Sequence, residues 1–305
     1  PTDYPDGNYE DVDFCLRARK KGYGIVYEPK TFLYHEAGGT KKLDVDRAKK
    51  TIQQNLLIFL AKWVNEDDAL FQPDKDSYPK VLVGCPTSDY KAYCLEQYLE
   101  SVKNLTYPNY EILIADNSKK KDYYERIKKS GVPVIRSKFK EKARDRIVSS
   151  RNILKDNVMK ENYNYFLSLE QDIIPPRDII EKLMSHNKEV AAGVYFLVNP
   201  FFDEHKLRTS IWTNYDPKTK QMFRVKNEFV LNNKVLLDVH ATGLGCILIS
   251  RKVLEKIKFR YDKKTEAFDD MFFCKYARDN GFKLYADTGV LCKHLVKGWS
   301  WEGIE

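Results

Sequence analysis

From residue 80 onward, short apolar segments alternate with longer segments of helical periodicity. The apolar segments cover residues 80–84, 110–115, 132–136 and 163–169. Helical patterns cover residues 90–102 and 143–159, between these segments. Because such alternation is typical of parallel strands joined by helical crossovers, it predicts an α/β fold with a mostly parallel, Rossmann-like sheet and helices on both faces.

Polar residues follow three of the apolar segments. They are Pro86 and Thr87, Asp116 to Ser118, and Glu170 to Asp172. Open α/β sheets bind their ligands at the carboxyl ends of the strands, where these residues fall. The sequence therefore predicts one ligand site built from three loops.

One pattern occurs twice, at a constant offset of 259 positions, in a chain of 305 residues. Each copy has an acidic pair, a helical segment, a glycine and a histidine, and Asp, Phe, Cys, Ala and Arg recur at matching positions. The first copy includes Asp11, Gly22 and His35, and the second includes Asp270, Gly281 and His294. Each copy predicts a helix that a glycine ends, a short strand, and a histidine just after the strand.

The first copy stands apart from the alternating region. Residues 44–64 form a helical pattern that places Ile52, Leu56, Phe59, Leu60 and Trp63 on one face. Residues 66–79 are acidic and contain two prolines, which is typical of a linker. We therefore expect two parts, residues 1–75 and 76–305. Since the chain starts at Pro1 without Met, we also expect that this is not the natural N-terminus.

Composition narrows the classes of ligand. The formal net charge of +8 suits anionic ligands such as nucleotide diphosphates, and it is compatible with peripheral contact with an acidic membrane surface. Nucleic acid is disfavoured because no dense Lys/Arg tract with interleaved aromatic residues occurs. Six scattered cysteines without a C-x-x-C pair predict reduced, buried thiols in a cytosolic protein. No apolar stretch is long enough to predict a transmembrane helix.

The order of these motifs resembles a family 2-type glycosyltransferase with the GT-A fold. The resemblance covers residues from about 80 to 296, and residues 1 to about 65 resemble only the closing third of the same family. It rests on Pro86-Thr87, Asp116-Asn117-Ser118, Ser150-Arg151-Asn152, Glu170-Gln171-Asp172, Thr242 to Cys246, Asp269-Asp270 and His294. The resemblance implies that residues 1–75 are a C-terminal fragment of one such domain plus a linker, and that residues 76–305 are a complete domain.

The resemblance also implies roles for individual residues. Asp172 and His294 are the expected ligands of a divalent cation, Mn2+ or Mg2+, which neutralises a departing diphosphate. Asp270 matches the family's catalytic base, which implies single displacement with inversion. The residues expected to bind the nucleotide are Pro86, Thr87, Asp116, Asn117, Arg151 and Glu170. Each acidic residue has a plainer alternative, since aspartates often cap helices or turns, and Arg151 could be a solvated helix charge.

The function expected from this resemblance is metal-dependent, inverting sugar transfer of the hexosyltransferase type. The donor is a nucleotide-diphosphate sugar, with UDP favoured, and the acceptor is a glycan or another hydroxyl compound in polysaccharide biosynthesis. We expect a cytoplasmic location, including the inner face of the membrane. Two alternatives stay open: a sugar-nucleotide nucleotidyltransferase and a catalytically inactive carbohydrate-binding or scaffold domain. Trp299 and Trp301 could stack on an acceptor sugar or simply pack the C-terminus.

Overall fold

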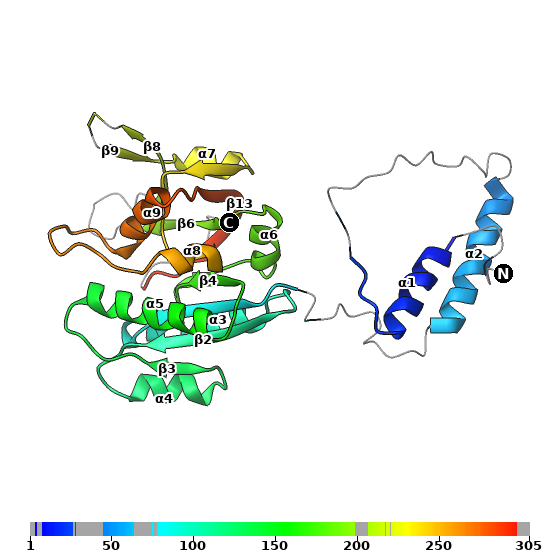
Figure 1. The fold of residues 1–305 in the computed structure, drawn as a ribbon, viewed down its shortest axis with the longest axis horizontal. Coiled ribbons are helices and arrows are strands. Elements are labelled where there is room, and N and C mark those ends of the chain that lie inside the picture. The colour runs from blue at the N-terminus through cyan, green and yellow to red at the C-terminus, as the bar shows by residue number, and fades with distance from the viewer. Residues whose placement is uncertain are drawn as a thin grey trace. The chain divides into compact units, whose positions relative to one another are not determined.

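The computed structural model describes residues 4, 8–26, 28, 45–63, 75, 78–198, 207–216, 218–219 and 221–297. The chain divides into two compact units, Pro1–Tyr78 and Pro79–Glu305 (Figure 1). The expectations for His35, Trp299 and Trp301 fall outside the described residues. None of the helices within the described ranges has both the length and the apolar character needed to cross a bilayer.

The first unit contains two helices, α1 (Glu10–Lys20) and α2 (Val45–Trp63). The bounds of α2 agree with the helix predicted over residues 44–64. Residues 23–26, directly after Gly22, have no regular secondary structure, and most of the segment predicted as a strand lies outside the described residues. A strand needs a neighbouring strand to satisfy its backbone groups, and the described part of this unit contains only helices.

A buried carboxylate joins the two helices of the first unit. Asp13 on α1 accepts hydrogen bonds from Trp63 Nε1 at 2.9 Å, Arg17 Nε at 2.8 Å and the Tyr4 hydroxyl at 3.2 Å. Lys62 Nζ forms an ion pair with the same carboxylate at 2.8 Å. Burial alone would raise the pKa of Asp13, but the bonds from Lys62, Trp63 and Arg17 outweigh it and lower the pKa to about 2.

We expect Asp13→Asn to destabilise the packing of α1 against α2 at neutral pH. Because the pKa is lower in the folded unit than the ordinary value of 3.8, the carboxylate stabilises the unit above pH 4, and this contribution is lost as pH falls toward 2. The hydrogen-exchange protection factors of the α1 amides, which are corrected for the intrinsic pH dependence of exchange, should therefore fall with acidification in the wild type. In Asp13→Asn, the protection factors should be lower at pH 7 and should depend less on pH. An unchanged pH dependence would contradict the assignment.

The second unit is built on a mixed sheet with the strand order β10-β13-β6-β12-β4-β1-β2-β3. Its strands, in chain order, are β1 (Val81–Thr87), β2 (Tyr110–Asp116), β3 (Val134–Arg136), β4 (Tyr165–Leu169), β6 (Val190–Val198), β10 (Leu236–Val239), β12 (Cys246–Ser250) and β13 (Leu284–His294). The β1–β2, β1–β4, β2–β3 and β6–β13 pairs are parallel. Strand β12 lies antiparallel between β4 and β6, and β10 pairs antiparallel with β13. The predicted α/β fold with a mostly parallel sheet is confirmed.

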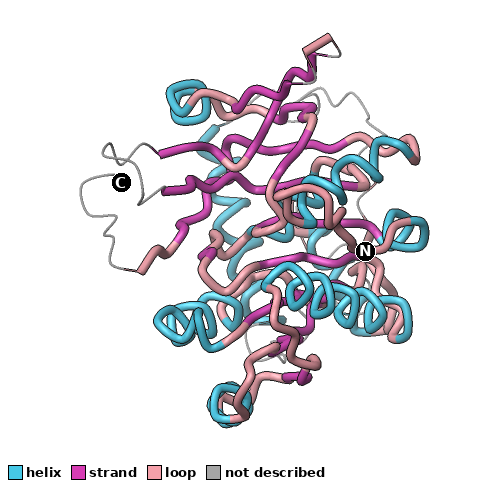
Figure 2. The backbone as a smooth tube through the Cα atoms, turned by 90° about the vertical axis from the view of Figure 1, so that its left-hand side faces the viewer, coloured by secondary structure: helices cyan, strands magenta, loops and turns pink. Residues whose placement is uncertain are grey.

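Helices flank this sheet (Figure 2). They are α3 (Leu95–Lys103), α4 (Asp122–Lys129), α5 (Ala143–Lys160), α6 (Ile179–Ser185), α7 (Asn227–Asn232), α8 (Arg251–Lys256) and α9 (Asp269–Asp279). The helix predicted over residues 90–102 begins instead as a 3₁₀ turn, η3 (Asp89–Cys94). The first turn differs from an α-helix because the carbonyl oxygen of Lys91 accepts hydrogen bonds from side chains, from Gln171 Nε2 at 2.6 Å and from Cys94 Sγ at 3.2 Å.

Five further strands complete the described part of this unit. Strand β5 (Ile173–Ile174) pairs with the end of β13, and β7 (Leu207–Thr209) pairs with β6. A separate three-stranded sheet contains β8 (Ile211–Asp216), β9 (Gln221–Arg224) and β11 (Ala241–Thr242), in the order β11-β8-β9. Helix α9 packs against β11 and β13.

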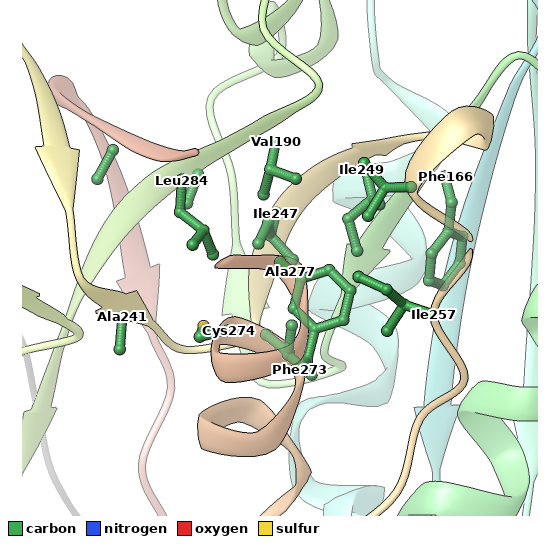
Figure 3. Packing of buried hydrophobic residues seen from close by; sticks show 14 of the residues in the cluster. Phe166, Val190, Ala241, Ile247, Ile249, Ile257, Phe273, Cys274, Ala277 and Leu284 are labelled. Carbon is green, nitrogen blue, oxygen red and sulfur yellow. The ribbon is translucent and has the colours of Figure 1, made fainter. Parts of the chain in front are cut away.

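The core of the second unit fixes the position of α9. Phe273 and Ala277 of this helix point toward Ile247 of β12 and its apolar neighbours (Figure 3). Phe273 stacks on Phe259 with the ring centroids 5.4 Å apart. All six cysteines of the chain are free, as predicted, and five of them are buried. Because the apolar face of α9 is locked into this core, the acidic residues in its first turn have a fixed position beside the sheet.

Candidate active site

The predicted loops meet at one edge of the sheet. Thr87 at the end of β1 pairs in register with Asp116 at the end of β2. The hydroxyl of Thr87 also donates a hydrogen bond to Oε1 of Gln171, in the loop after β4. Gln171 is buried, and it accepts a second hydrogen bond from the Tyr123 hydroxyl at 2.7 Å. Gln171 therefore ties the end of β1 and helix α4 to the loop after β4, a role that its position between two acidic residues did not reveal.

Asp172 and His294 lie in contact because β5 pairs with the last two residues of β13. Ile173 is the register partner of His294, and His294 Nε2 is 3.1 Å from Asp172 Oδ2. The other ring nitrogen, Nδ1, lies 3.0 Å from the carbonyl oxygen of Phe196. When Nδ1–H donates to this carbonyl, Nε2 presents a lone pair to the carboxylate, and both groups are then suited to bind a cation.

The residues present fit a divalent cation with two protein ligands. Oδ1 of Asp172 is buried, and it has no hydrogen-bond partner among the described residues. The described residues contain no cluster of three or more His, Cys, Asp or Glu side chains that could hold a metal. Oxygen atoms of a bound diphosphate or of water would have to complete the coordination, as is usual for Mg2+ beside substrate phosphates.

Lys91 is a member of this site that the sequence did not reveal. Its ammonium group forms an ion pair with Asp172 Oδ2, and its side chain is 35% exposed. Burial alone would lower the pKa of Lys91, but the charges of Asp172 and Glu170 outweigh it and raise the pKa, so Lys91 stays protonated. The same contact contributes to Asp172: burial would raise its pKa, but His294 and Lys91 lower it to about 2. A lysine on a surface helix usually extends into solvent, so the sequence carries no signal for this contact.

Arg151 on α5 joins the loop after β4 to the start of α9. Its guanidinium is buried, donates to Glu170 Oε1 through Nη2, and lies 3.2 Å from Asp269 Oδ2 through Nη1. Arg151 is therefore not a solvated helix charge. Burial raises the pKa of Asp269 to about 6, despite the opposing charge of Arg151. The expected contact of Arg151 with a nucleotide stays a prediction, while the structure places its guanidinium between two carboxylates.

Asp270 is the next residue in the first turn of α9. It is half-buried, and its Oδ1 accepts a hydrogen bond from the backbone N–H of Met271 at 2.7 Å. Burial raises its pKa above the ordinary value of an aspartate. Arg224 of β9 opposes this shift through its charge, and its guanidinium lies 4.0 Å from the centre of the Trp212 ring. The three-stranded sheet therefore contributes a cation to the electrostatic surroundings of Asp270.

Asp116 and its neighbours form the other end of the site. Oδ1 of Asp116 accepts a hydrogen bond from the backbone N–H of Ser118 at 3.0 Å, whereas Oδ2 is buried without a hydrogen-bond partner among the described residues. Asn117 donates to Ser150 Oγ at 3.1 Å. Pro86 is buried within β1. Oδ2 of Asp116 faces the guanidinium of Arg136, whose Nε lies 3.9 Å away, beyond hydrogen-bond distance.

Sequence comparison assigns the family. The sequence model described as "Glycosyl transferase family 2" matches residues 90–258, which is more than half of the chain. The chain belongs to glycosyl transferase family 2. No curated protein sequence matches this family 2 chain.

Superposition on GalNAc-T7 shows that this family 2 glycosyltransferase has the GT-A fold. GalNAc-T7, solved with UDP, GalNAc and Mn2+, superposes with a TM-score of 0.51 and 14% sequence identity, over 92% of this chain and 63% of that chain. A197 from STIV matches 72% of this chain and 86% of its own, with 15% identity and a TM-score of 0.42. At such low identity, GalNAc-T7 supports the fold alone.

The glycine-rich segment of this family 2 domain makes room for Tyr195. The hydroxyl of Tyr195 accepts a hydrogen bond from the backbone N–H of Gly245 at 3.2 Å, and its ring lies edge-on to His294, with the centroids 5.8 Å apart. A Cβ atom at Gly243 would lie 2.1 Å from this hydroxyl oxygen. At Gly245 it would lie 2.7 Å from the hydroxyl oxygen and 2.8 Å from ring carbon Cζ. The two glycines therefore keep Tyr195 beside the histidine of the site.

We expect Gly243→Ala to destabilise the second unit by about 1–3 kcal/mol, the usual cost of overpacking. Tyr195→Phe should recover most of this loss, because the main clash of the new methyl group is with the hydroxyl oxygen. Gly245→Ala is the matched control, since its methyl group also meets Cζ and Tyr195→Phe should rescue it poorly. Denaturant unfolding of the single and double variants measures these couplings. Equal rescue of both variants would contradict this packing.

Proposed function

We propose that this family 2 protein is a metal-dependent, inverting glycosyltransferase of the hexosyltransferase type. It moves a sugar from a nucleotide-diphosphate donor, with UDP favoured, to a hydroxyl group of a glycan or a similar acceptor. The observation that carries the proposal is the contact between Asp172 and His294, beside Glu170, whose charge acts on Asp270. GalNAc-T7, which shares the fold, was solved with UDP, GalNAc and Mn2+.

The nucleotide part of the donor would bind between the ends of β1 and β2. Oδ2 of Asp116, which has no hydrogen-bond donor among the described residues, can accept a hydrogen bond from a base N–H or a ribose hydroxyl. Thr87 and Asn117 connect this carboxylate to the neighbouring loops, because the backbone N–H of Asn117 donates to the carbonyl of Thr87 at 2.9 Å. Lys91 supplies a positive charge for the diphosphate.

Asp172 and His294 would hold Mn2+ or Mg2+. Such a cation stabilises the negative charge that develops on the departing diphosphate. Arg151 keeps Glu170 fixed beside this site through its buried guanidinium. We propose that Arg151 positions Glu170 and Asp269, because its guanidinium contacts these two carboxylates of the chain.

Asp270 would act as the general base. The acceptor hydroxyl gives its proton to the carboxylate, and its oxygen attacks the anomeric carbon. The bond between this carbon and the diphosphate oxygen breaks, and the nucleoside diphosphate leaves with the electron pair. A raised pKa makes the carboxylate a better proton acceptor, while ordinary carboxylates remain ionised at neutral pH. One displacement inverts the anomeric centre and needs no covalent intermediate with the enzyme.

A panel of nucleotide sugars tests the proposal. We expect UDP with Mn2+ to raise the melting temperature, because a ligand that binds only the folded state stabilises it by mass action. One UDP-sugar should also be hydrolysed slowly in the absence of acceptor, and NMR of a transferred product should show an inverted anomeric centre. Absence of any nucleotide-dependent shift across UDP, GDP and other diphosphates would contradict the donor assignment. A shift without turnover would favour the inactive, carbohydrate-binding alternative.

We further propose that the acceptor is a growing polysaccharide or envelope glycan, reached in the cytoplasm or at the inner face of the membrane. The net charge of +8 supports contact with an anionic surface. The family assignment disfavours the nucleotidyltransferase alternative.

The two copies of the repeated pattern support a proposal for the domains. Gly22 and Gly281 end α1 and α9 with the same φ of 82°. In both copies the glycine N–H bonds to an arginine carbonyl at 2.8 Å, and the next N–H bonds to an alanine carbonyl five residues earlier, the pattern of a Schellman motif. The donor and acceptor pairs are Gly22–Arg19 and Tyr23–Ala18 in α1, and Gly281–Arg278 and Phe282–Ala277 in α9.

Equivalent apolar side chains differ in burial between the copies. Phe14 on α1 is 62% exposed, whereas its counterpart Phe273 on α9 is 1% exposed. Ile25 is 52% exposed, and its counterpart Leu284 is fully buried. Among the described residues, the first copy therefore carries the core-facing residues of a glycosyltransferase fold without the sheet that covers them in the second unit. On this basis we propose that residues 1–75 are a C-terminal fragment of such a domain plus a linker, and that residues 76–305 are the complete domain.

A further inference from the structure

Both carboxylates of the Glu170-Gln171-Asp172 motif are already paired with cations of the chain. Arg151 holds Glu170, and Lys91 holds Asp172. The two side chains differ in how freely they can move, because that of Arg151 is 1% exposed whereas that of Lys91 is 35% exposed. Arg151 is therefore a fixed partner, and Lys91 can leave its carboxylate by rotation of its flexible stem.

The ammonium of Lys91 competes with a metal ion for Asp172. It binds Oδ2, the oxygen that also faces His294 Nε2. A divalent cation between these two atoms would lie close to the ammonium charge, and the two cations would repel each other. The metal can therefore bind well only after Lys91 has moved away.

A diphosphate is the ligand that would displace the Lys91 ammonium from Asp172. Its oxygens offer an ammonium group alternative charge-assisted hydrogen bonds, and the release of Asp172 then leaves a buried carboxylate that needs a new cation. We infer that Lys91 couples donor and metal binding: it occupies Asp172 when no donor is present, and the donor diphosphate draws it away and opens the carboxylate to the metal. This inference rests on the proposed nucleotide-sugar donor. Because coupling is reciprocal, each ligand should strengthen the binding of the other, and typical couplings are about 5- to 150-fold.

Lys91→Met in the full chain tests this role with two binding measurements that do not need turnover. Electron paramagnetic resonance measures the affinity for Mn2+ alone, which we expect to increase by about 5-fold or more, since the competing ammonium is gone. Calorimetry measures the affinity for UDP in the presence of EDTA, which we expect to decrease, since the diphosphate loses a cation. The opposite directions are diagnostic, because general damage to the site would weaken both affinities.

Two further variants control the experiment. Lys91→Arg keeps the charge, and its affinity for Mn2+ alone should stay low. Lys182→Met removes an exposed lysine that pairs with Asp178 on the surface, and it should change neither affinity. An unchanged or weaker affinity of Lys91→Met for Mn2+ alone would overturn the inference. If the wild type does not bind UDP even in the presence of Mn2+, the proposed donor is wrong. This outcome differs from a failure of the Lys91 inference, which concerns the affinity of Lys91→Met for Mn2+ alone.

Discussion

Asp270→Asn is expected to lower the rate of sugar transfer by about 10²-fold or more, the usual contribution of a general base. Asparagine keeps the shape of the side chain, and its amide oxygen can still accept the hydrogen bond from the Met271 N–H. What it loses is the ability to take a proton from the acceptor hydroxyl. UDP affinity in the presence of Mn2+ should therefore stay nearly unchanged, and the loss should appear in kcat rather than in donor binding.

Asp11→Asn is the matched control for this prediction. Asp11 occupies the equivalent repeat position, and its Oδ1 accepts a hydrogen bond from the Val12 N–H at 2.8 Å, as Asp270 does from Met271. Because the sequence of the first unit has no counterpart of the nucleotide loops or of Asp172, Asp11→Asn should alter neither transfer nor UDP binding. Equal losses in the two variants would refute the proposal that the first unit is a fragment, and full activity of Asp270→Asn would exclude this residue as the base.

The strands that are easiest to predict from the sequence are those whose burial produces a simple pattern of apolar residues. Strand β1 is buried along its whole length, and such strands read as continuous apolar runs. Because β2, β1 and β4 are parallel neighbours, the polar residues at their carboxyl ends lie at one edge of the sheet, as the sequence predicted. The antiparallel position of β12 between β4 and β6 could not be predicted in this way, because an apolar run does not specify its direction.

The residues that the sequence missed act through long-range contacts. Lys91 and Asp172 are far apart in the chain, and Gln171 contacts Thr87 across a similar separation. Neither residue type is distinctive, since lysine is common on helices and glutamine is common in turns. Arg151 was recognised by its motif, but its burial between Glu170 and Asp269 depends on how α5, the loop after β4 and α9 pack together. Such packing is determined by the tertiary structure, so it produces no periodic pattern in the local sequence.

Asp172→Asn is expected to abolish the Mn2+-dependent part of UDP binding and, with it, turnover. The carboxylate supplies the formal negative charge to a cation, and asparagine offers a neutral oxygen of the same shape. The substitution also removes the partner of the Lys91 ammonium, so UDP binding in EDTA should persist or increase because that cation becomes available to the diphosphate.

Calorimetric titration of UDP with Mn2+ and with EDTA separates the two effects of Asp172→Asn. The matched control is Asp178→Asn, which makes the same substitution at an exposed aspartate paired with Lys182 and should behave as the wild type. His294→Ala should weaken the metal dependence less severely, because water can occupy the vacated coordination site. Metal-dependent UDP binding at full strength in Asp172→Asn would remove this residue as a ligand, and the metal would then have to bind elsewhere in the domain.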